Sequence, residues 1–325
     1  MRNKNLINAV LYSILFIAII VSIFTGAVKI EPHNLFSGVY NDVLKLRLAR
    51  IWLGILAGSA LGIAGLMLQG VLRNPLAEPY VLGISSGSAL GAVLAMLIAK
   101  SGWLSIGLMP IISFVFGILT ILIVLSIAKT RGKIPIQTLL LSGIIVGAVF
   151  SSILLFLISV SRSNVIHDAI WWLLGNLQIF NMRLLAVITF VVTIGIAGAY
   201  WFSKDLNAIS LGEEEAIHLG VNIEVVKKWV LAIAALLTAA IVCTCGIIGF
   251  VGLVIPHLAR LLIGADHRRL VPVIIAMGGI FLITCDTLSR TIILPAEIPV
   301  GAITALIGGP FFIYLLKTKG KVHFK

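Results

Sequence analysis

The sequence predicts an all-α polytopic membrane protein with about ten transmembrane helices in a single domain that covers residues 1–325. Hydrophobic residues form 60% of the chain and charged residues only 11%, whereas a soluble domain usually carries about 25% charged residues. Apolar runs of roughly 18 residues or more, long enough to cross a bilayer, recur from end to end. These observations leave no room for a soluble domain of ordinary size.

Charged residues and helix breakers divide the first half of the chain into five expected spans. The first follows Arg2 and Lys4 and is too long for the apolar segment of a usual signal peptide. After the second span, Asn74-Pro75 and Pro79 interrupt the chain, so the third helix is expected to be short. The expected spans are residues 6–28, 48–70, 82–99, 104–128 and 136–160.

The second half contains five more expected spans. The nearly uncharged run 229–264 is too long for one helix and barely long enough for two, at a rise of about 1.5 Å per residue. The string "CGIIGFVGLVIPH" is therefore expected to divide this run into one full helix and one short helix. The expected spans are residues 184–203, 229–248, 252–264, 270–292 and 300–317.

Each half thus has a break and a short helix after its second span. Because five is an odd number, the two halves would insert in opposite senses, which makes an inverted repeat of two five-helix halves plausible. Glycines also recur at every fourth residue in the second and third spans, a spacing that predicts close helix packing. They are Gly54, Gly58, Gly62, Gly83, Gly87 and Gly91.

Ten spans place both termini on the same side of the membrane, and the basic residues identify that side. Of the 24 Lys and Arg residues, sixteen fall on the side of the termini and eight on the other. The positive-inside rule therefore predicts that both termini are cytoplasmic, together with Glu213, Glu214 and Glu215. The basic residues lie in short breaks between apolar runs rather than on one face, which argues against a nucleic-acid partner.

The motifs of an ATP-binding or metal-dependent enzyme are missing. There is no G-x-x-x-x-G-K-[ST] P-loop and no H-E-x-x-H, and the 6 histidines show no metal-ligand spacing. We therefore expect no catalytic residue, no metal site and no cofactor in this chain. Cys243, Cys245 and Cys285 lie inside apolar runs and are expected to be unpaired.

Ionisable residues are almost absent from the interiors of the expected spans. Asp286 comes closest, and Arg290 at i+4 can form an ion pair with it on the same helix face. A carrier driven by protons or sodium ions would need carboxylates buried in the membrane. The energy source is therefore expected to lie in another subunit, and a stand-alone secondary carrier or channel is the alternative.

Several long motifs between residues 44 and 317 resemble, in the same order, those of one transporter family. This family is the FecCD-like permease subunits of type II bacterial ABC importers, which carry iron–siderophores, haem and cobalamin. The motifs are "RLAR", "LQGVLRNPLAEPYVLGISSGSALGA", "LGEEEAIHLGV", "GFVGLVIPHLARLLIGADHRRLVP" and "PAEIPVGAITALIGGPFFIYLL".

The resemblance implies a multi-pass protein of the bacterial cytoplasmic (inner) membrane that works by alternating access. Its implied partners are a cytoplasmic ABC ATPase dimer that binds the ATP, an extracytoplasmic substrate-binding protein, and a second copy of the permease or a similar subunit. The implied cargo is a chelated metal compound, with a ferric siderophore as the leading candidate; cobalamin, haem and oxyanions such as molybdate are the alternatives.

The segment at about 205–228 is expected to couple the permease to the ATPase. Its acidic residues suit the first turn of a helix, and Gly220 suits the end of one. We expect two short cytoplasmic helices, the first beginning at Gly212 and the second opening at Asn222; a plain solvated turn is the alternative. By the resemblance, the coupling residues are Gly212, Glu213, Ala216, Leu219 and Gly220.

Two further groups of residues receive roles. Arg47, Arg50 and Arg290 fall at the expected outer surface, and the resemblance implies that they dock acidic residues of the binding protein; anchoring of helix ends at the membrane surface is the alternative. The family motif "RLPR" reads "RLAR" here, so the local backbone can differ. The resemblance also implies a cytoplasmic gate near the loop that joins the fourth and fifth spans, and Ile136 and Gln137 are the candidates for it.

Overall fold

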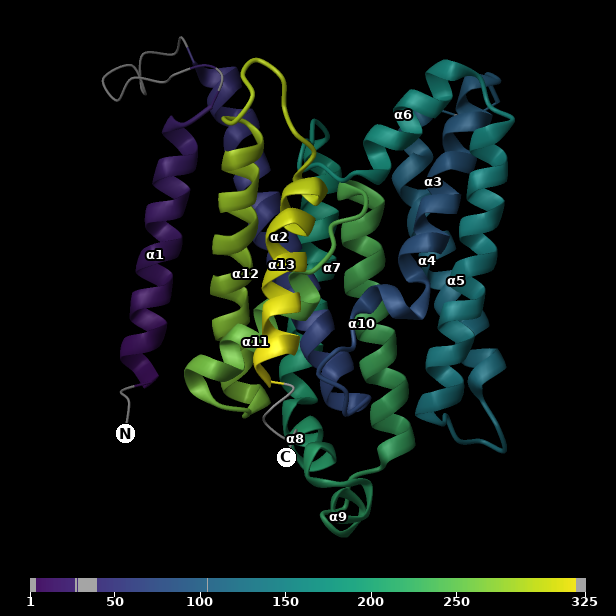
Figure 1. Ribbon diagram of the computed structural model, residues 1–325, viewed down its shortest axis with the longest axis vertical. Coiled ribbons are helices and arrows are strands. Elements are labelled where there is room, and N and C mark those ends of the chain that lie inside the picture. The colour runs from purple at the N-terminus through teal and green to yellow at the C-terminus, as the bar shows by residue number, and fades with distance from the viewer. Residues whose placement is uncertain (1–3, 27, 29–39, 104, 320–325) are drawn as a thin grey trace.

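The computed structural model describes residues 4–26, 28, 40–103 and 105–319, which form a bundle of α-helices with no β-strand among them (Figure 1). Seven helices are long and apolar enough to cross a membrane. Together with three shorter apolar helices they match the ten expected spans. The ten are α1 (Lys4–Phe24), α2 (Asn41–Val71), α3 (Ile84–Lys100), α4 (Met109–Ala128), α5 (Ile136–Ser159), α7 (Met182–Trp201), α10 (Ile223–Cys245), α11 (Val251–Ile263), α12 (His267–Ser289) and α13 (Val300–Lys319).

Five shorter elements connect these helices. The helix α6 was not predicted, because it is too short and too polar at its start to meet the length criterion for a membrane span. The connecting elements are η2 (Pro79–Leu82), η3 (Ile106–Leu108), α6 (Ser163–Leu173), α8 (Ser203–Leu211) and α9 (Glu213–His218).

The expectation of a second short helix opening at Asn222 is wrong. Asn222 does cap a helix, because its side chain accepts a hydrogen bond from the N–H of Val225, but that helix is the long α10. Nothing between Ile223 and Cys245 breaks the helix, and Lys227 lies inside it with carboxylate partners. The pair of short helices exists one step earlier in the chain, as α8 and α9.

The two ends of the bundle differ. The helix α9 protrudes from one end, here called the α9 end, where α1 begins and α13 finishes; α6 lies at the opposite, α6 end (Figure 1). The first helix therefore begins, and the last helix ends, on the same side of the bundle, as an even number of spans requires. Arg2, Lys29, Lys321 and Lys325, which contribute to the predicted orientation, lie outside the described residues.

The helix α2 forms the centre of the bundle, packed against α12, α10, α11 and α7. Within its most apolar window, 89% of the residues are buried. A Cβ atom at Gly58 would collide with the backbone carbonyl of Gly278 on α12, and one at Gly65 with the carbonyl of Gly252 on α11. The predicted close helix packing is confirmed, since glycine lets these backbones touch.

Two non-helical segments interrupt the bundle and hydrogen-bond to each other. The Glu78 side chain, before η2, accepts a bond of 2.9 Å from the N–H of Phe250, before α11. The Tyr80 hydroxyl accepts a bond of 3.0 Å from the N–H of Ile248 and donates to its carbonyl oxygen. Side chains of the first break thus satisfy backbone groups of the second, as a membrane interior demands. The two breaks occupy matching places in the order of elements, and the inverted repeat stays a prediction.

Candidate functional site

Two glycines shape the tip of the α9 end. Gly212 joins α8 to α9 with φ +151, and a Cβ atom there would collide with the Glu215 carboxylate. Gly220 follows α9 with φ +81, in the left-handed region that glycine adopts at low cost. The predicted beginning of a short helix at Gly212 and its end at Gly220 are both confirmed.

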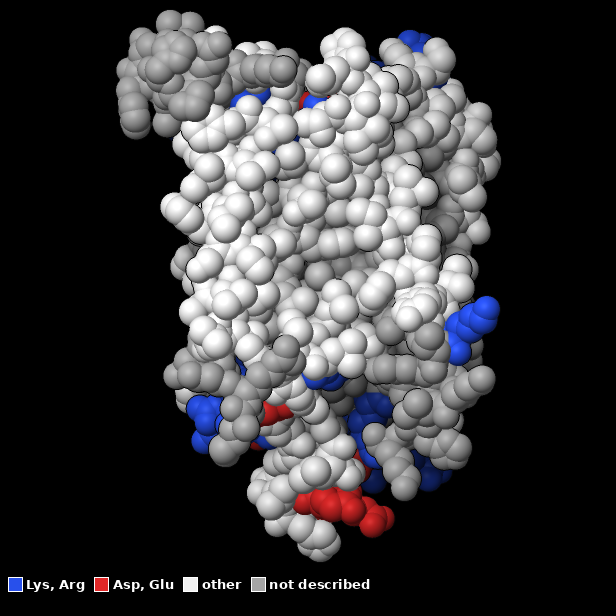
Figure 2. Space-filling view, turned by 60° about the vertical axis from the view of Figure 1, so that its left-hand side comes forward, with Lys and Arg blue, Asp and Glu red and all other residues white. Residues whose placement is uncertain are grey.

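The two helices expose apolar side chains beyond the bundle. Leu211 is 69% exposed, Ile217 60% and Leu219 64%, while Ala216 is fully buried beneath them. Acidic side chains gather on the same protruding tip, with basic side chains around its base (Figure 2). Exposed apolar residues rimmed by charge are typical of a surface that binds another protein. The sequence-based assignment included Leu219 but missed Leu211 and Ile217. Both are apolar residues in an otherwise polar connection between membrane spans, and that pattern could have identified them.

A side-chain cluster fixes α8 to the start of α12. Asn207 donates a hydrogen bond of 2.9 Å to Asp266, which caps α12, and accepts one of 2.9 Å from the N–H of His267. Burial alone raises the pKa of the Asp266 carboxyl. Hydrogen bonds from Asn207 and from the N–H of Arg268, with the charge of Arg269, outweigh this effect and hold the pKa below its usual value. Asp266 is therefore a charged cap on α12 at neutral pH.

A pocket of about 320 Å³ at the α9 end brings the coupling and gate candidates together. Its lining includes Glu213 of α9 and both Ile136 and Gln137 at the start of α5. The sequence separates these residues widely, and nothing in it predicted their proximity. The remaining lining residues are Lys133, Ile134, Pro135, Glu224 and Lys227.

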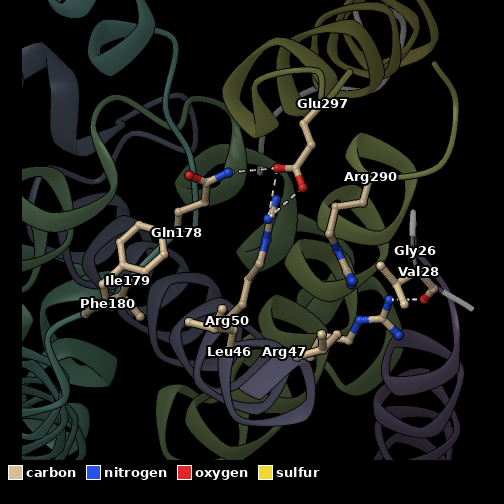
Figure 3. Close-up of a pocket in the computed structure, with 11 residues that line it drawn as sticks. Gly26, Val28, Leu46, Arg47, Arg50, Gln178, Ile179, Phe180, Arg290 and Glu297 are labelled. Carbon is tan, nitrogen blue, oxygen red and sulfur yellow. Dashed lines mark hydrogen bonds and ion pairs between the residues drawn. The ribbon is translucent and has the colours of Figure 1, made fainter. Parts of the chain in front are cut away.

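A buried carboxylate organises the opposite, α6 end. Asp286 of α12 is only 2% exposed, and its two oxygens receive Arg50 Nε at 2.6 Å and Arg290 Nε at 3.0 Å. Arg50 also pairs with Glu297 at 2.9 Å, and Glu297 accepts a bond of 2.9 Å from Gln178 (Figure 3). The predicted i,i+4 pair of Asp286 and Arg290 is confirmed; Glu297 and Gln178 were not anticipated.

The three arginines lie at the end of the bundle opposite α9, as expected, but they are largely buried rather than exposed on its surface. Arg47 is 7% exposed and Arg290 5%, and the Arg50 side chain is 11% exposed. Arg47 donates to the carbonyl of Ile23 at 2.6 Å, and Arg290 donates to Ser22 Oγ at 2.7 Å, so both are fixed to the end of α1. The guanidinium groups are buried because carbonyls and carboxylates within the chain supply their partners.

The three arginines line a pocket of about 270 Å³ that Figure 3 shows from within. Apolar side chains form one part of its wall, among them Leu46 and Phe180. An anion from outside would have to compete with Glu297 and Asp286 for Arg50, and with Asp286 for Arg290. The docking role of the arginines stays a prediction.

One string in the sequence imitates a hydrolase motif. Residues 83–87, "GISSG", fit the G-x-S-x-G pattern, in which a serine nucleophile stands on a strand-to-helix turn beside a histidine. Here Ser85 lies in α3, and its buried hydroxyl has no hydrogen-bond partner in the part of the chain that the structure describes. Within that part, no group of three or more His, Cys, Asp or Glu side chains could hold a metal ion.

The family described as the FecCD transport family matches residues 14–318. The chain is 41% identical over 274 residues to the cobalamin import system permease protein BtuC of Halobacterium salinarum, covering 84% of this chain and 73% of that protein. It is 37% identical over 299 residues to the hemin transport system permease protein HmuU of Yersinia pestis, covering 90% and 89%. A solved structure, described as an inward-facing conformation of an ABC transporter provisionally assigned to the metal-chelate type, matches with a TM-score of 0.87 and 30% identity, covering 97% of this chain and 99% of that one.

Proposed function

The chain belongs to the FecCD transport family, and we propose that it is the permease subunit of an ATP-binding-cassette importer that moves a chelated metal compound into the cell by alternating access. A ferric siderophore is the first cargo to test, as the sequence motifs suggest. Cobalamin and hemin are tested beside it, because the names of the two relatives described above include these compounds. In this proposal the chain hydrolyses no ATP itself, since it lacks a P-loop.

The α9 end faces the cytoplasm in this proposal. The bundle is a multi-pass membrane protein, with seven helices of membrane-spanning length and hydropathy among the described residues. Acidic side chains gather on the tip that protrudes from one end of it (Figure 2). Most basic residues of the chain fall on this side by the count of the sequence, and the positive-inside rule then assigns it to the cytoplasm. Both terminal helices share that side.

The observation that carries the proposal is the protruding pair α8–α9. It presents Leu211, Ile217 and Leu219 to solvent at the end where the membrane helices finish. A dimer of ATPase subunits would receive this surface, and its closure on ATP would displace the tip. Because α8 is fixed to α12 through Asn207, that displacement reaches the bundle directly.

Co-purification tests this interface. A cytoplasmic ATPase with a P-loop should copurify with the intact chain, and Leu219→Asp should weaken its affinity by at least about tenfold, the loss expected when a buried apolar anchor is removed. His218→Asn, at an exposed neighbouring position, is the matched control and should bind as the parent does. Equal ATPase binding by the parent and Leu219→Asp would contradict the proposed surface, and a chain that transports without any ATPase would be a secondary carrier or channel.

The α6 end would receive the substrate-binding protein. An acidic residue of that protein would have to displace Glu297 from Arg50, because these two side chains are paired within the chain. Glu297→Gln should therefore tighten docking and leave the buried pair of Arg50 with Asp286 intact. The affinity of the purified binding protein for each variant is the measurement, with Asp168→Asn, in an exposed ion pair of the same end, as the control. Docking that is unchanged or weakened in Glu297→Gln would remove Arg50 from the docking surface.

The second permease subunit is proposed from family membership. A homodimer would place two copies of α9 beside two ATPase subunits and leave a path for the cargo between the permeases. The distinction between a homodimer and a pair of similar chains is open to native mass measurement of the purified complex.

A further inference from the structure

One chain of polar contacts joins α9 to the start of α5. Glu213, the first residue of α9, places Oε1 at 3.0 Å from Lys227 Nζ on α10. Lys227 Nζ lies 3.5 Å from Glu224 Oε1, one turn earlier on the same helix. The other carboxylate oxygen, Glu224 Oε2, accepts a hydrogen bond of 3.0 Å from the backbone N–H of Ile134. Ile134 lies two residues before Ile136, where α5 begins.

Lys227, in the middle of this series of contacts, is buried and therefore depends on its carboxylate partners. The Lys227 side chain is only 7% exposed, whereas its partners Glu213 and Glu224 are 43% and 29% exposed. A buried ammonium group is costly without carboxylate partners, so Lys227 holds both acids when the surroundings shift. A displacement of Glu213 with α9 therefore displaces Lys227 or Glu224 as well.

Packing alone gives α9 little access to α5. In the described part of the chain, α9 packs mainly against α8 and α10, while α5 packs against α3, α4 and η2. The pocket of about 320 Å³ separates the tip from the start of α5, and the polar contacts lie along its wall.

We propose that Lys227 and Glu224 are positioning residues that transmit a displacement of α9 to the start of α5, where Ile136 and Gln137 lie. The inference rests on the proposed function, in which the ATPase displaces α9. It adds the route by which that displacement reaches the gate candidates: an ion-paired contact that ends on a backbone N–H. Such coupling needs a contiguous physical connection with two arrangements, and this set of contacts supplies the connection.

Cysteine labelling in the assembled complex with the ATPase tests the route without knowledge of the cargo. One reporter is His218→Cys, at an exposed position of the tip outside the proposed apolar contact, and the other is Gln137→Cys at the exposed start of α5. The native Cys243, Cys245 and Cys285 are buried and contribute little background. The measurement is the rate of maleimide labelling of each reporter, without nucleotide and after trapping with ADP and vanadate.

In the parent, we expect nucleotide trapping to change the labelling rate at both reporters. In Glu224→Ala and Lys227→Met, the change at His218→Cys should persist while the change at Gln137→Cys is lost. Lys227→Arg should retain the response at Gln137→Cys, because it keeps the charge between the two acids. Glu214→Gln, which alters an exposed acid of α9 beside Glu213, is the matched control and should behave as the parent.

The outcomes separate this inference from the function on which it rests. If the response at Gln137→Cys survives in both Glu224→Ala and Lys227→Met, the route is wrong although the coupling surface stands. If labelling of His218→Cys in the parent is the same with and without the ATPase and does not change on nucleotide trapping, the proposed contact of α9 with the ATPase is wrong. Variants that no longer respond at His218→Cys while the parent does would assign Lys227 and Glu224 to the fold of the tip and also overturn the inference.

Discussion

At the scale of single residues, Asp286 is the group on which the α6 end depends. One nearly buried carboxylate bridges Arg50 of α2 and Arg290 at the end of α12. Arg290 in turn reaches the carbonyl of Thr25 at 3.1 Å, at the end of α1. Three helices are thus joined through one acid.

Substitution of Asp286 should greatly lower the free energy of unfolding. Asp286→Ala leaves two buried guanidinium groups without their shared partner, and breaking a buried ion pair on one side costs about 3–5 kcal/mol of unfolding free energy. Asp168→Ala is the matched control, because its pair with Lys100 is exposed and worth about 0–1 kcal/mol. The measurement is the unfolding of the purified variants in detergent. Equal losses of unfolding free energy in Asp286→Ala and Asp168→Ala would mean that the buried ion pairs of Asp286 stabilise the fold no more than an exposed pair does.

Part of the site around Asp286 could be predicted from the sequence. The i+4 spacing of Asp286 and Arg290 was sufficient to predict their ion pair. The partner Arg50 lies 236 positions away from Asp286, and only the packing of α2 against α12 brings them together. The arginines were expected on the surface because helix ends usually are, and their burial depends on loops whose course the sequence does not define.

At the scale of elements, close helix packing depends on glycine. Gly58→Val should force α2 away from α12, because a Cβ atom there would overlap the Gly278 carbonyl. The unfolding free energy should fall by about 3 kcal/mol or more. Gly107→Ala is the control, since its Cβ would meet only Ser105 Oγ, at 3.5 Å. A Gly58→Val protein as stable as the parent would show that the helices are free to separate at that crossing.

Element prediction succeeded where hydropathy decides and was incomplete where it does not. The long apolar runs located the membrane helices, and the breaks at Pro79 and at residues 246–250 were expected from local composition. The short α6 gave no signal of sufficient length. The bend at Gly212 was recognised as the start of a helix, but the extension of α10 back to Ile223 was missed, because Glu224, Lys227 and Lys228 imitate a polar loop.

At the scale of the whole molecule, the two ends have separate tasks in the proposed importer. The α9 end presents apolar and acidic groups on a protruding tip, and the α6 end holds a buried network of arginines and carboxylates. The bundle between them is crossed by two mutually bonded breaks, which join its halves. Alternating access would require these halves to move relative to each other when the ATPase closes.

Uptake into proteoliposomes tests the central claim most directly. The chain is reconstituted with its copurifying ATPase and binding protein, and a ferric siderophore, cobalamin and hemin are offered in turn on the side of the binding protein. We predict that at least one chelate accumulates only when ATP is present on the side of α9, and that a substitution of the P-loop lysine in the ATPase abolishes accumulation. Accumulation by the chain alone, without ATP or ATPase, would contradict the account.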